Sequence, residues 1–388
     1  MLHTTIKCLR GQNPFVSNNA MFVGVAGTMS GASVVAIDEQ GCYIAHHSSP
    51  RGRGLVWNLV ERPQRITAMN VLLDDLACRF NPPINKEALC DRLKRIAIGM
   101  SGVDWRYPAV FHEVMSHIGV AGRYFLSSIG EVTYCGALMM APGILIRSGT
   151  GSTVYGVNDF GAIHLTNSWD RVVGDQGSGF QISRRLLNIA ACQADGRLEL
   201  QAADEVALEL ARSQNCRTFT ELHNRILDAQ EFQGRSEHVR LIADLSRAAF
   251  TLASKENRLA LEVLDRCAAE LVLGAEAVCR KLGFTGARVV PVVLSGRVLQ
   301  NELFYRTLVR KKLYELANKA GVSFKIVRGE FGPAVGAALI AVTGNRVPPP
   351  AQVVSNLRST LPSREIAPEL YYPLIAELMD DSSNATRS

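Results

Sequence analysis

The chain has 388 residues, of which 47% are hydrophobic and 20% charged, and it carries a formal net charge of +6. This length exceeds what a single hydrophobic core usually supports, so we expect two domains. The basic residues are spread along the chain in no block longer than Arg310-Lys311-Lys312, which argues against a dedicated nucleic-acid binder. No apolar run is long enough for a membrane span. Nine scattered cysteines, none in a Cys-x-x-Cys pair, indicate reduced thiols in a cytoplasmic protein.

The first part of the chain predicts three adjacent antiparallel strands followed by alternating helices and strands. Residues 1–20 contain no Asp or Glu; we expect a flexible extension there, with a transit-like leader as the alternative. Short apolar segments separated by glycine turns predict the strands, and apolar residues at helical spacing predict the helices. The expected strands are 21–25, 32–37, 42–46, 94–100 and 124–127, and the expected helices are 62–80, 109–118 and 131–140.

The same pattern then begins again. The expected strands are 143–147, 153–157, 162–166, 289–294 and 323–327; the expected helices are 178–194, 201–213, most of 217–275, a long amphipathic helix over 259–281, 301–317 and 333–342. Because strand–strand–strand–helix–strand–helix occurs twice, we expect two similar domains, over 21–142 and 143–345, with a cleft between them. Residues 346–388 predict a surface tail with one short helix at 372–379.

One glycine-rich turn stands between two apolar strands of the second half, in the sequence Ser148-Gly149-Thr150-Gly151-Ser152. Glycine lets the backbone approach a ligand closely, and successive N–H groups in such a turn form an anion-binding concavity. The three hydroxyl side chains add further donors. A phosphate would therefore suit this turn, although an ordinary Gly/Ser hairpin is the alternative. The turn is not a Walker A loop, because no Gly-Lys-Ser/Thr follows it.

Four further glycine-containing loops follow predicted strands, where α/β proteins carry their ligands. Taken in order with the turn, the chain reads GVAGTMS, GMSGVD, SGTGSTVYGVNDFG, SWDRVVGDQGSG, VVLSGRVLQN and GPAVGAAL. This set resembles the N-acetylglucosamine kinase branch of the BadF/BadG/BcrA/BcrD-type ATPases, in the sugar kinase/Hsp70/actin superfamily, and the resemblance extends over residues 21–345. It implies an α/β fold of two similar ribonuclease H-like (actin-like ATPase) domains with an interdomain cleft. It also implies transfer of the γ-phosphoryl group of ATP to a hydroxyl of an amino sugar such as N-acetylglucosamine or glucosamine.

The resemblance assigns roles to individual residues. The nucleotide would be bound by Gly27, Ser30, Ser148, Gly149, Thr150, Gly151 and Gly296. The sugar would be bound by Ser101, Asp104, Ser152, Thr153, Ser168, Trp169 and Asp175. Trp169 would stack on the sugar or, alternatively, pack in the protein. Mg²⁺ would arrive with the ATP phosphates, with no metal site built from side chains, and we expect a homodimer without nucleic-acid or membrane partners.

The sequence departs from the family pattern at its acidic positions. The acid that opens the first glycine hairpin in the family is Ala26 here, and the catalytic aspartate is replaced by Ile129 or Gly130. Phosphoryl transfer requires a carboxylate near the attacking hydroxyl. Glu131 is therefore the first candidate catalytic residue, and Asp104 is the second. Glu131 could equally be a first-turn acid favoured by the helix dipole. A second hypothesis is therefore a degenerate regulatory protein that binds nucleotide or sugar without fast transfer.

Overall fold

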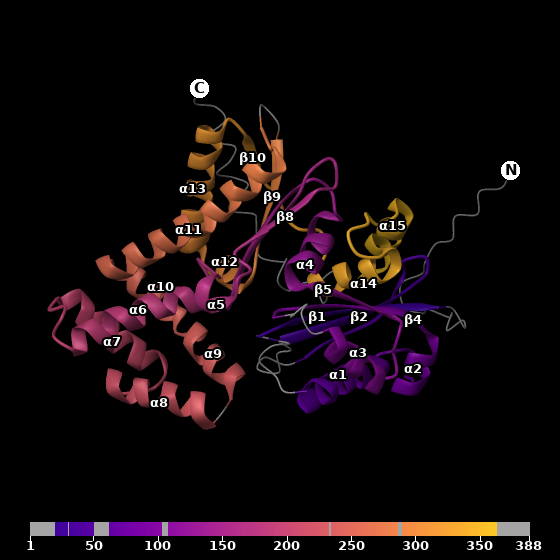
Figure 1. Cartoon of the computed structure of the whole chain (residues 1–388), viewed down its shortest axis with the longest axis horizontal. Helices are drawn as coiled ribbons and strands as arrows, with labels where there is room; N and C mark the ends of the chain where they lie inside the picture. Colours follow the sequence, from indigo (N-terminus) through magenta and orange to yellow (C-terminus); the bar gives the residue numbers. More distant parts are fainter. Residues whose placement is uncertain are drawn as a thin grey trace.

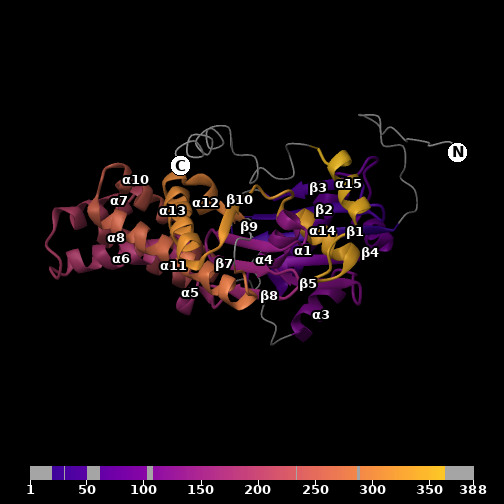
Figure 2. The ribbon, with the colours of Figure 1, turned by 90° about the horizontal axis from the view of Figure 1, so that it is seen from above.

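The computed structural model describes residues 20–29, 31–49, 62–102, 108–232, 234–285 and 289–362. Within these ranges the chain forms two five-stranded sheets in one elongated molecule (Figures 1 and 2). Helices cover the outer face of each sheet, and two further helices cross between the sheets. No helix in the described ranges is long and apolar enough to cross a lipid bilayer.

The first sheet has the strand order β3-β2-β1-β4-β5. Its first three strands are antiparallel, whereas β1, β4 and β5 run parallel to one another. Turn residues fall between apolar runs, so the three antiparallel strands form as consecutive hairpins. The strands are β1 (Met21–Thr28), β2 (Gly31–Asp38), β3 (Tyr43–Ser48), β4 (Leu93–Met100) and β5 (Tyr124–Ser128).

The second sheet repeats this arrangement, with the order β8-β7-β6-β9-β10. Again the first three strands are antiparallel and the last two join in parallel. The strands are β6 (Gly143–Ser148), β7 (Ser152–Val157), β8 (Ile163–Thr166), β9 (Val289–Ser295) and β10 (Ser323–Ile326). The expected duplication of an actin-like α/β unit is thereby confirmed, and the β1–β2 and β6–β7 hairpins occupy equivalent places in the two sheets.

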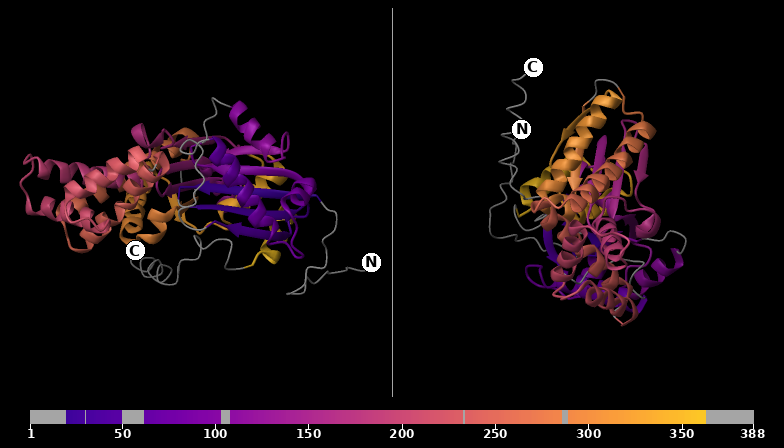
Figure 3. Two further views of the ribbon diagram at one scale, coloured as in Figure 1. Left: turned by 90° about the horizontal axis from the view of Figure 1, so that it is seen from below. Right: turned by 90° about the vertical axis from the view of Figure 1, so that its left-hand side faces the viewer.

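Each sheet has its own outer helical layer and hydrophobic core. The first sheet is covered by α1 (Arg62–Ala77), α2 (Lys86–Arg92) and α3 (Pro108–His117). The layer of the second sheet is larger and shares one core with β6, β7 and β9. It consists of α6 (Gly179–Ala194), α7 (Gln201–Ser213), α8 (Phe219–Phe232), α9 (Arg235–Asp244), α10 (Ser246–Ser254), α11 (Arg258–Leu282) and α13 (Leu303–Ala320). Figure 3 shows this helical group at the end of the molecule farthest from the first sheet.

A third core lies between the two sheets, around α4 (Ile129–Leu138) and α14 (Pro333–Thr343). The two helices cross where Gly136 of α4 meets Gly336 of α14. A Cβ on Gly136 would lie 2.6 Å from the carbonyl oxygen of Gly332, and one on Gly336 would collide with the carbonyl oxygen of Val132. Only glycine permits backbones to approach this closely, so these two positions fix how the halves join.

The end of the described chain returns to the first sheet. Although α14 follows the second sheet in sequence, it packs on β1, where a Cβ on Gly24 would collide with the α14 backbone. It is followed by α15 (Ala351–Thr360), where the Asn356 side chain donates to the carbonyl oxygen of Gln40 at 2.7 Å and Thr360 Oγ1 accepts from the Tyr43 N–H at 2.9 Å. Figure 2 shows both helices over the first sheet.

The sequence-based assignment of elements missed several short helices. A tail with no helix before residue 372 was expected, yet α15 forms there, and α2 was also missed. Both helices are short and mostly polar, and α15 buries only Val353, Val354 and Leu357, so their stability comes mainly from packing. The predicted helix at 372–379 lies outside the described residues. The proposed domain limits, 1–20, 21–142, 143–345 and 346–388, stay a prediction.

Candidate active site

The turn of the second hairpin presents unused backbone donors. The strand pairing of Ser148 with Ser152 leaves a three-residue turn, in which the Gly149 N–H donates to the carbonyl oxygen of Gly151 at 2.9 Å. Within the described chain, the N–H groups of Thr150 and Gly151 and the Thr150 hydroxyl make no hydrogen bond. A Cβ on Gly149 would make only ordinary van der Waals contacts, the nearest at 3.9 Å, so a methyl group would fit beside the turn. These donors fit an anionic group such as phosphate.

The two serines that flank this turn have a different role from the one expected. The Ser148 hydroxyl donates to the carbonyl oxygen of Gly177 and the Ser152 hydroxyl to that of Gln176, both at 2.7 Å, and both side chains are buried. Their hydroxyl groups are therefore used to hold the loop of residues 174–178 against the hairpin. The expectation that these hydroxyls face the ligand is wrong for this structure; the two serines position the turn.

The loop of residues 174–178 places a carboxylate directly beside the turn. Asp175 adopts a φ of 56°, and its Oδ1 accepts a hydrogen bond from the Ser152 N–H at 3.1 Å. A Cβ on Gly151 would lie 2.7 Å from Asp175 Oδ2, so glycine at this position makes room for the carboxylate. The side chain is partly exposed. Asp175 does not cap α6, because the Ser178 side chain makes that cap, and the contact of Asp175 with a ligand stays a prediction.

Burial raises the pKa of Asp175 to about 6, from an ordinary value of 3.8. The cause is mainly the loss of water around the carboxylate, and the negative charge of Asp170 adds to it. The Ser152 N–H and the positive charges of Arg147 and Arg171 act in the opposite direction. A carboxyl group with a pKa near neutrality, in reach of solvent and of an anion-binding turn, is typical of functional sites.

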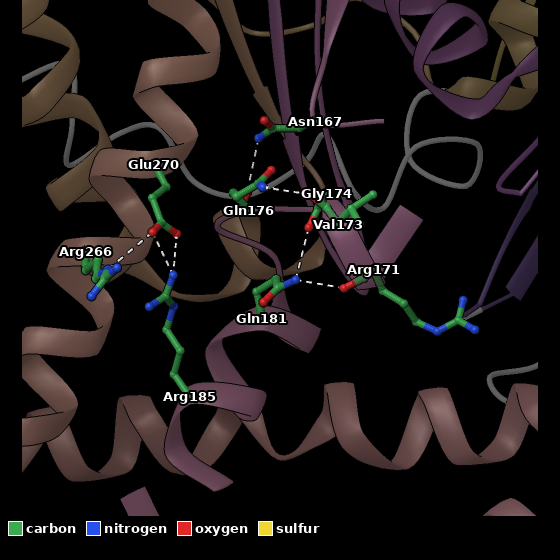
Figure 4. Close-up of polar contacts among 9 residues, drawn as sticks. All are labelled: Asn167, Arg171, Val173, Gly174, Gln176, Gln181, Arg185, Arg266 and Glu270. Atoms are coloured by element: carbon green, nitrogen blue, oxygen red, sulfur yellow. Dashed lines mark hydrogen bonds and ion pairs between the residues drawn. The ribbon is translucent and has the colours of Figure 1, made fainter. Parts of the chain in front are cut away.

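Amide side chains hold the loop that carries Asp175 (Figure 4). The Gln181 side chain donates to the carbonyl oxygens of Arg171 at 2.8 Å and Gly174 at 3.0 Å, and the Asn167 side chain donates to that of Gln176 at 3.2 Å. On the same helix as Gln181, Arg185 forms a two-pronged ion pair with Glu270 of α11, at 2.7 and 2.8 Å. The loop is therefore fixed between α6 and the second sheet, which pre-organises the carboxylate.

The loops after β4 and β9 lie against the two hairpins in equivalent ways. The Ser101 N–H donates to the carbonyl oxygen of Gly27 at 3.1 Å. Gly296 has a φ of 91°, and a Cβ there would collide with the backbone of Ser148. Glycine is thus required at 296, and α12 (Arg297–Asn301) begins directly beside the second hairpin. Ser101 thus lies beside Gly27, and Gly296 lies beside Ser148. The expected contacts of Ser101 with the sugar and of Gly296 with the nucleotide stay predictions.

Three of the expected sugar-binding residues lie on one side of the second hairpin. Thr153 Oγ1 and Ser168 Oγ are 3.3 Å apart, and Trp169 follows at the start of α5 (Asp170–Val173) with 77% of its surface exposed. The alternative that Trp169 packs in the protein is therefore wrong. Its indole ring is accessible at the beginning of the segment that leads to Asp175.

Of the two candidate catalytic residues, the structure describes Glu131, whose carboxylate lies in the core between the sheets. Glu131 is only 7% exposed, accepts a hydrogen bond from the Ser127 hydroxyl at 2.8 Å, and has its Oε1 3.8 Å from Arg346 Nε. It borders Tyr155 and Cys135 in the core between the sheets, where its negative charge is a secondary cause of their raised pKa after burial. A buried carboxylate cannot contact a sugar in this conformation. Asp104 and Ser30 lie outside the described residues.

Two residues near the turn had not been selected from the sequence. Arg147 Nη2 lies 3.9 Å from the place a Cβ would take on Gly149, so a positive charge stands beside the turn. Phe180 donates its N–H to the carbonyl oxygen of Thr150 at 3.2 Å and packs against Met29 of the first hairpin and Val239 of α9. A basic residue just before a glycine turn was a visible signal for Arg147; the role of Phe180 depends on tertiary contacts. No group of three or more His, Cys, Asp or Glu side chains suited to a metal ion occurs in the described ranges.

Comparisons with known proteins agree with this architecture. The chain is 26% identical over 247 residues to an N-acetylmuramic acid/N-acetylglucosamine kinase of Clostridium acetobutylicum, covering 63% of this chain and 76% of that protein. It is 25% identical over 334 residues to an N-acetyl-D-glucosamine kinase of Dictyostelium discoideum, covering 84% of this chain and 99% of that protein.

A solved structure from Chromobacterium violaceum, provisionally assigned to the N-acetylglucosamine kinases, shares the fold with a TM-score of 0.64 at 18% identity, covering 84% of this chain and 100% of that one. Residues 107–341, more than half of the chain, match the BadF/BadG/BcrA/BcrD ATPase family. The chain therefore belongs to the BadF/BadG/BcrA/BcrD ATPase family.

Proposed function

We propose that this protein is an ATP-dependent kinase that transfers the γ-phosphoryl group to a hydroxyl of an amino sugar such as N-acetylglucosamine. The observation that carries the proposal is the second hairpin, whose unused N–H groups at Thr150 and Gly151 lie beside the Asp175 carboxylate. Phosphoryl transfer depends mainly on positioning and on stabilising charge, and this turn offers both within one rigid element. Membership of an ATPase family and two relatives named as N-acetylglucosamine kinases support it.

In this proposal the phosphates bind at the turn and the sugar binds beside it. Thr150 and Gly151 donate to the terminal phosphate, Arg147 adds positive charge, and Gly27 and Gly296 border the nucleotide. Thr153, Ser168 and Trp169 contact the sugar together with Asp175. Bound Mg²⁺ would neutralise charge on the phosphates. Ala26 has no carboxylate to hold this ion, and we propose that it is carried by the ATP phosphates.

The second candidate is a regulatory protein that binds nucleotide or sugar without fast transfer. It is favoured by Ala26, and by Ile129 or Gly130, at acidic positions of the family pattern and by the buried Glu131. The two candidates make opposite predictions for turnover but the same prediction for binding.

A coupled ADP-release assay over a panel of hexosamines tests the kinase. We expect sugar-dependent ADP release with an N-acetylated or free amino sugar, and no release with any sugar would contradict the proposal. Calorimetry with the same sugars and with ATP identifies the second candidate, which would bind without consuming nucleotide. A cytoplasmic homodimer is part of the proposal, and light scattering of the purified chain measures its oligomeric state.

A further inference from the structure

We propose that Asp175 is the catalytic residue that accepts the proton of the attacking sugar hydroxyl. This inference rests on the proposed kinase function and assigns a role that the family pattern gives to another position. Three observations support it: the accessibility of the carboxylates near the turn, the contacts that fix Asp175, and the charges around this residue.

The positions at the start of α4 do not supply an accessible base. Ile129 has no ionisable group and is buried. Glu131 has a carboxylate, but it is only 7% exposed, and one of its oxygens accepts a hydrogen bond from the Ser127 hydroxyl. Changing its rotamer would break the hydrogen bond from Ser127 and leave a buried hydroxyl group unpaired. Among the described residues, the carboxylate for proton transfer must therefore come from the other side of the turn.

Asp175 stands where a proton acceptor is needed. Its Oδ1 is fixed by the Ser152 N–H, and its Oδ2 lies against Gly151, which belongs to the turn proposed to hold the terminal phosphate. A general base must lie within hydrogen-bond reach of the hydroxyl that attacks this phosphate. A hydroxyl placed between the turn and Asp175 meets both conditions. Because the loop is held by Gln181 and Asn167, the carboxylate is already positioned before the substrate binds.

The charged groups around Asp175 suit this role. Asp170 of α5 is paired with the Arg171 guanidinium at 3.1 Å, so the two carboxylates of this segment have different environments. The remaining neighbour that acts on Asp175 through its charge is Arg147 of β6. Burial, opposed by these arginines, brings the pKa of Asp175 to about 6. A base with this pKa is ionised at neutral pH and holds a proton more readily than an exposed aspartate, which is the compromise that general-base catalysis requires.

The proposed step balances in atoms and charge. The sugar oxygen forms a bond to the γ-phosphorus of ATP while the bond from that phosphorus to the β,γ-bridging oxygen breaks. The electron pair of the broken bond leaves with ADP. The hydroxyl proton passes to Asp175, and solvent removes it after the sugar phosphate has left, since the side chain is partly exposed.

Steady-state kinetics of the full chain as a function of pH test the assignment, with Asp175→Asn compared with Glu131→Gln. Asparagine keeps the shape of the side chain and an oxygen that can accept from the Ser152 N–H. We expect Asp175→Asn to lower kcat by about 10²- to 10⁴-fold, to leave the affinity for ATP unchanged in calorimetry, and to abolish the acidic limb of the kcat profile. Glu131→Gln should retain that limb, with its midpoint near pH 6 as in the wild type.

The outcomes separate this inference from the kinase proposal. An active wild type whose kcat and acidic limb both survive in Asp175→Asn would overturn the role of Asp175 and leave the kinase function standing. The same conclusion would follow if Asp175→Asn raised only the KM for the sugar, because the residue would then be a binding contact. A wild type inert toward every hexosamine would overturn the proposed function and this inference with it.

Discussion

Met29, in the turn of the first hairpin, packs against Val239 of α9, which belongs to the helical layer of the second sheet. Both side chains are buried, and Phe180 at the start of α6 packs on the same pair. In Figure 1, α9 lies on the side of its helical group that faces the first sheet. This small apolar cluster therefore connects the tip of one hairpin to the other half of the molecule, close to the turn proposed to bind phosphate.

A double-mutant cycle tests whether this contact stabilises the joined halves. We expect Met29→Ala and Val239→Ala each to lower the free energy of unfolding by about 2 kcal/mol, at the low end for buried apolar side chains, since the cluster is small. The double variant should lose less than the sum, with a coupling of at least about 0.5 kcal/mol. Urea denaturation measures the values, and Val173→Ala, which is 68% exposed, is the control. Strict additivity would show that the two side chains are not coupled.

Gly336 offers a test of the helix crossing between the sheets. Alanine there would drive a methyl group into the backbone of α4, at the carbonyl oxygen of Val132, and no side-chain movement relieves a clash with backbone. We expect Gly336→Ala to destabilise the protein by about 3 kcal/mol or more. Gly196→Ala is the matched control: its methyl group meets nothing within 4 Å, so only its φ of 71° opposes the change, at a cost of about 1 kcal/mol. Equal thermal midpoints for the two variants would contradict the close crossing.

The strands and the larger helices could be predicted from the sequence because local patterns determine them. Apolar runs such as 144–146 mark strands, and the spacing of apolar residues marks α11. The repeated order of elements then leads to the duplicated fold. In contrast, α2 and α15 were missed, since packing against distant elements stabilises them more than their own sequences do.

The site was predictable only as a set of loops. Glycine positions located the second hairpin and the Asp175 loop correctly, because glycine marks close backbone approach. The sequence does not reveal that the hydroxyl groups of Ser148 and Ser152 donate hydrogen bonds to that loop. Nor does it reveal that the Glu131 side chain lies in a core. These facts depend on contacts between residues far apart in the chain. The raised pKa of Asp175 has the same origin, since it arises from tertiary burial.

The two glycines of the second turn should respond differently to alanine. At Gly149 a methyl group has no neighbour closer than 3.9 Å, so Gly149→Ala should fold normally but fill part of the proposed phosphate space. We expect its affinity for ATP to fall at least about tenfold, which is 1.4 kcal/mol at 25 °C. At Gly151 the methyl group would lie 2.7 Å from Asp175 Oδ2 and displace it, so Gly151→Ala should lose turnover as well. Calorimetry with ATP and thermal melting measure both; unchanged ATP affinity in Gly149→Ala would place the phosphate elsewhere.

The pH dependence of stability gives an independent measure of Asp175. Burial raises the pKa of this carboxyl to about 6 in the folded protein, against 3.8 for the ordinary group, so the folded state binds the proton more tightly than the unfolded chain does. The stability contributed by protonated Asp175 is complete below pH 4 and is lost as the pH rises through 6, which costs up to about 3 kcal/mol at pH 7. Asparagine carries no charge to bury.

We therefore expect Asp175→Asn to be more stable than the wild type at pH 7 and to lose this advantage near pH 4, although the same change should strongly lower kcat. Thermal melting of the two proteins between pH 4 and pH 8 measures the difference. Stabilisation by removal of a charged group is expected where a fold maintains an unfavourable environment for function. A variant less stable than the wild type at pH 7 would show instead that the Asp175 carboxylate serves mainly to hold the hairpin and its loop together.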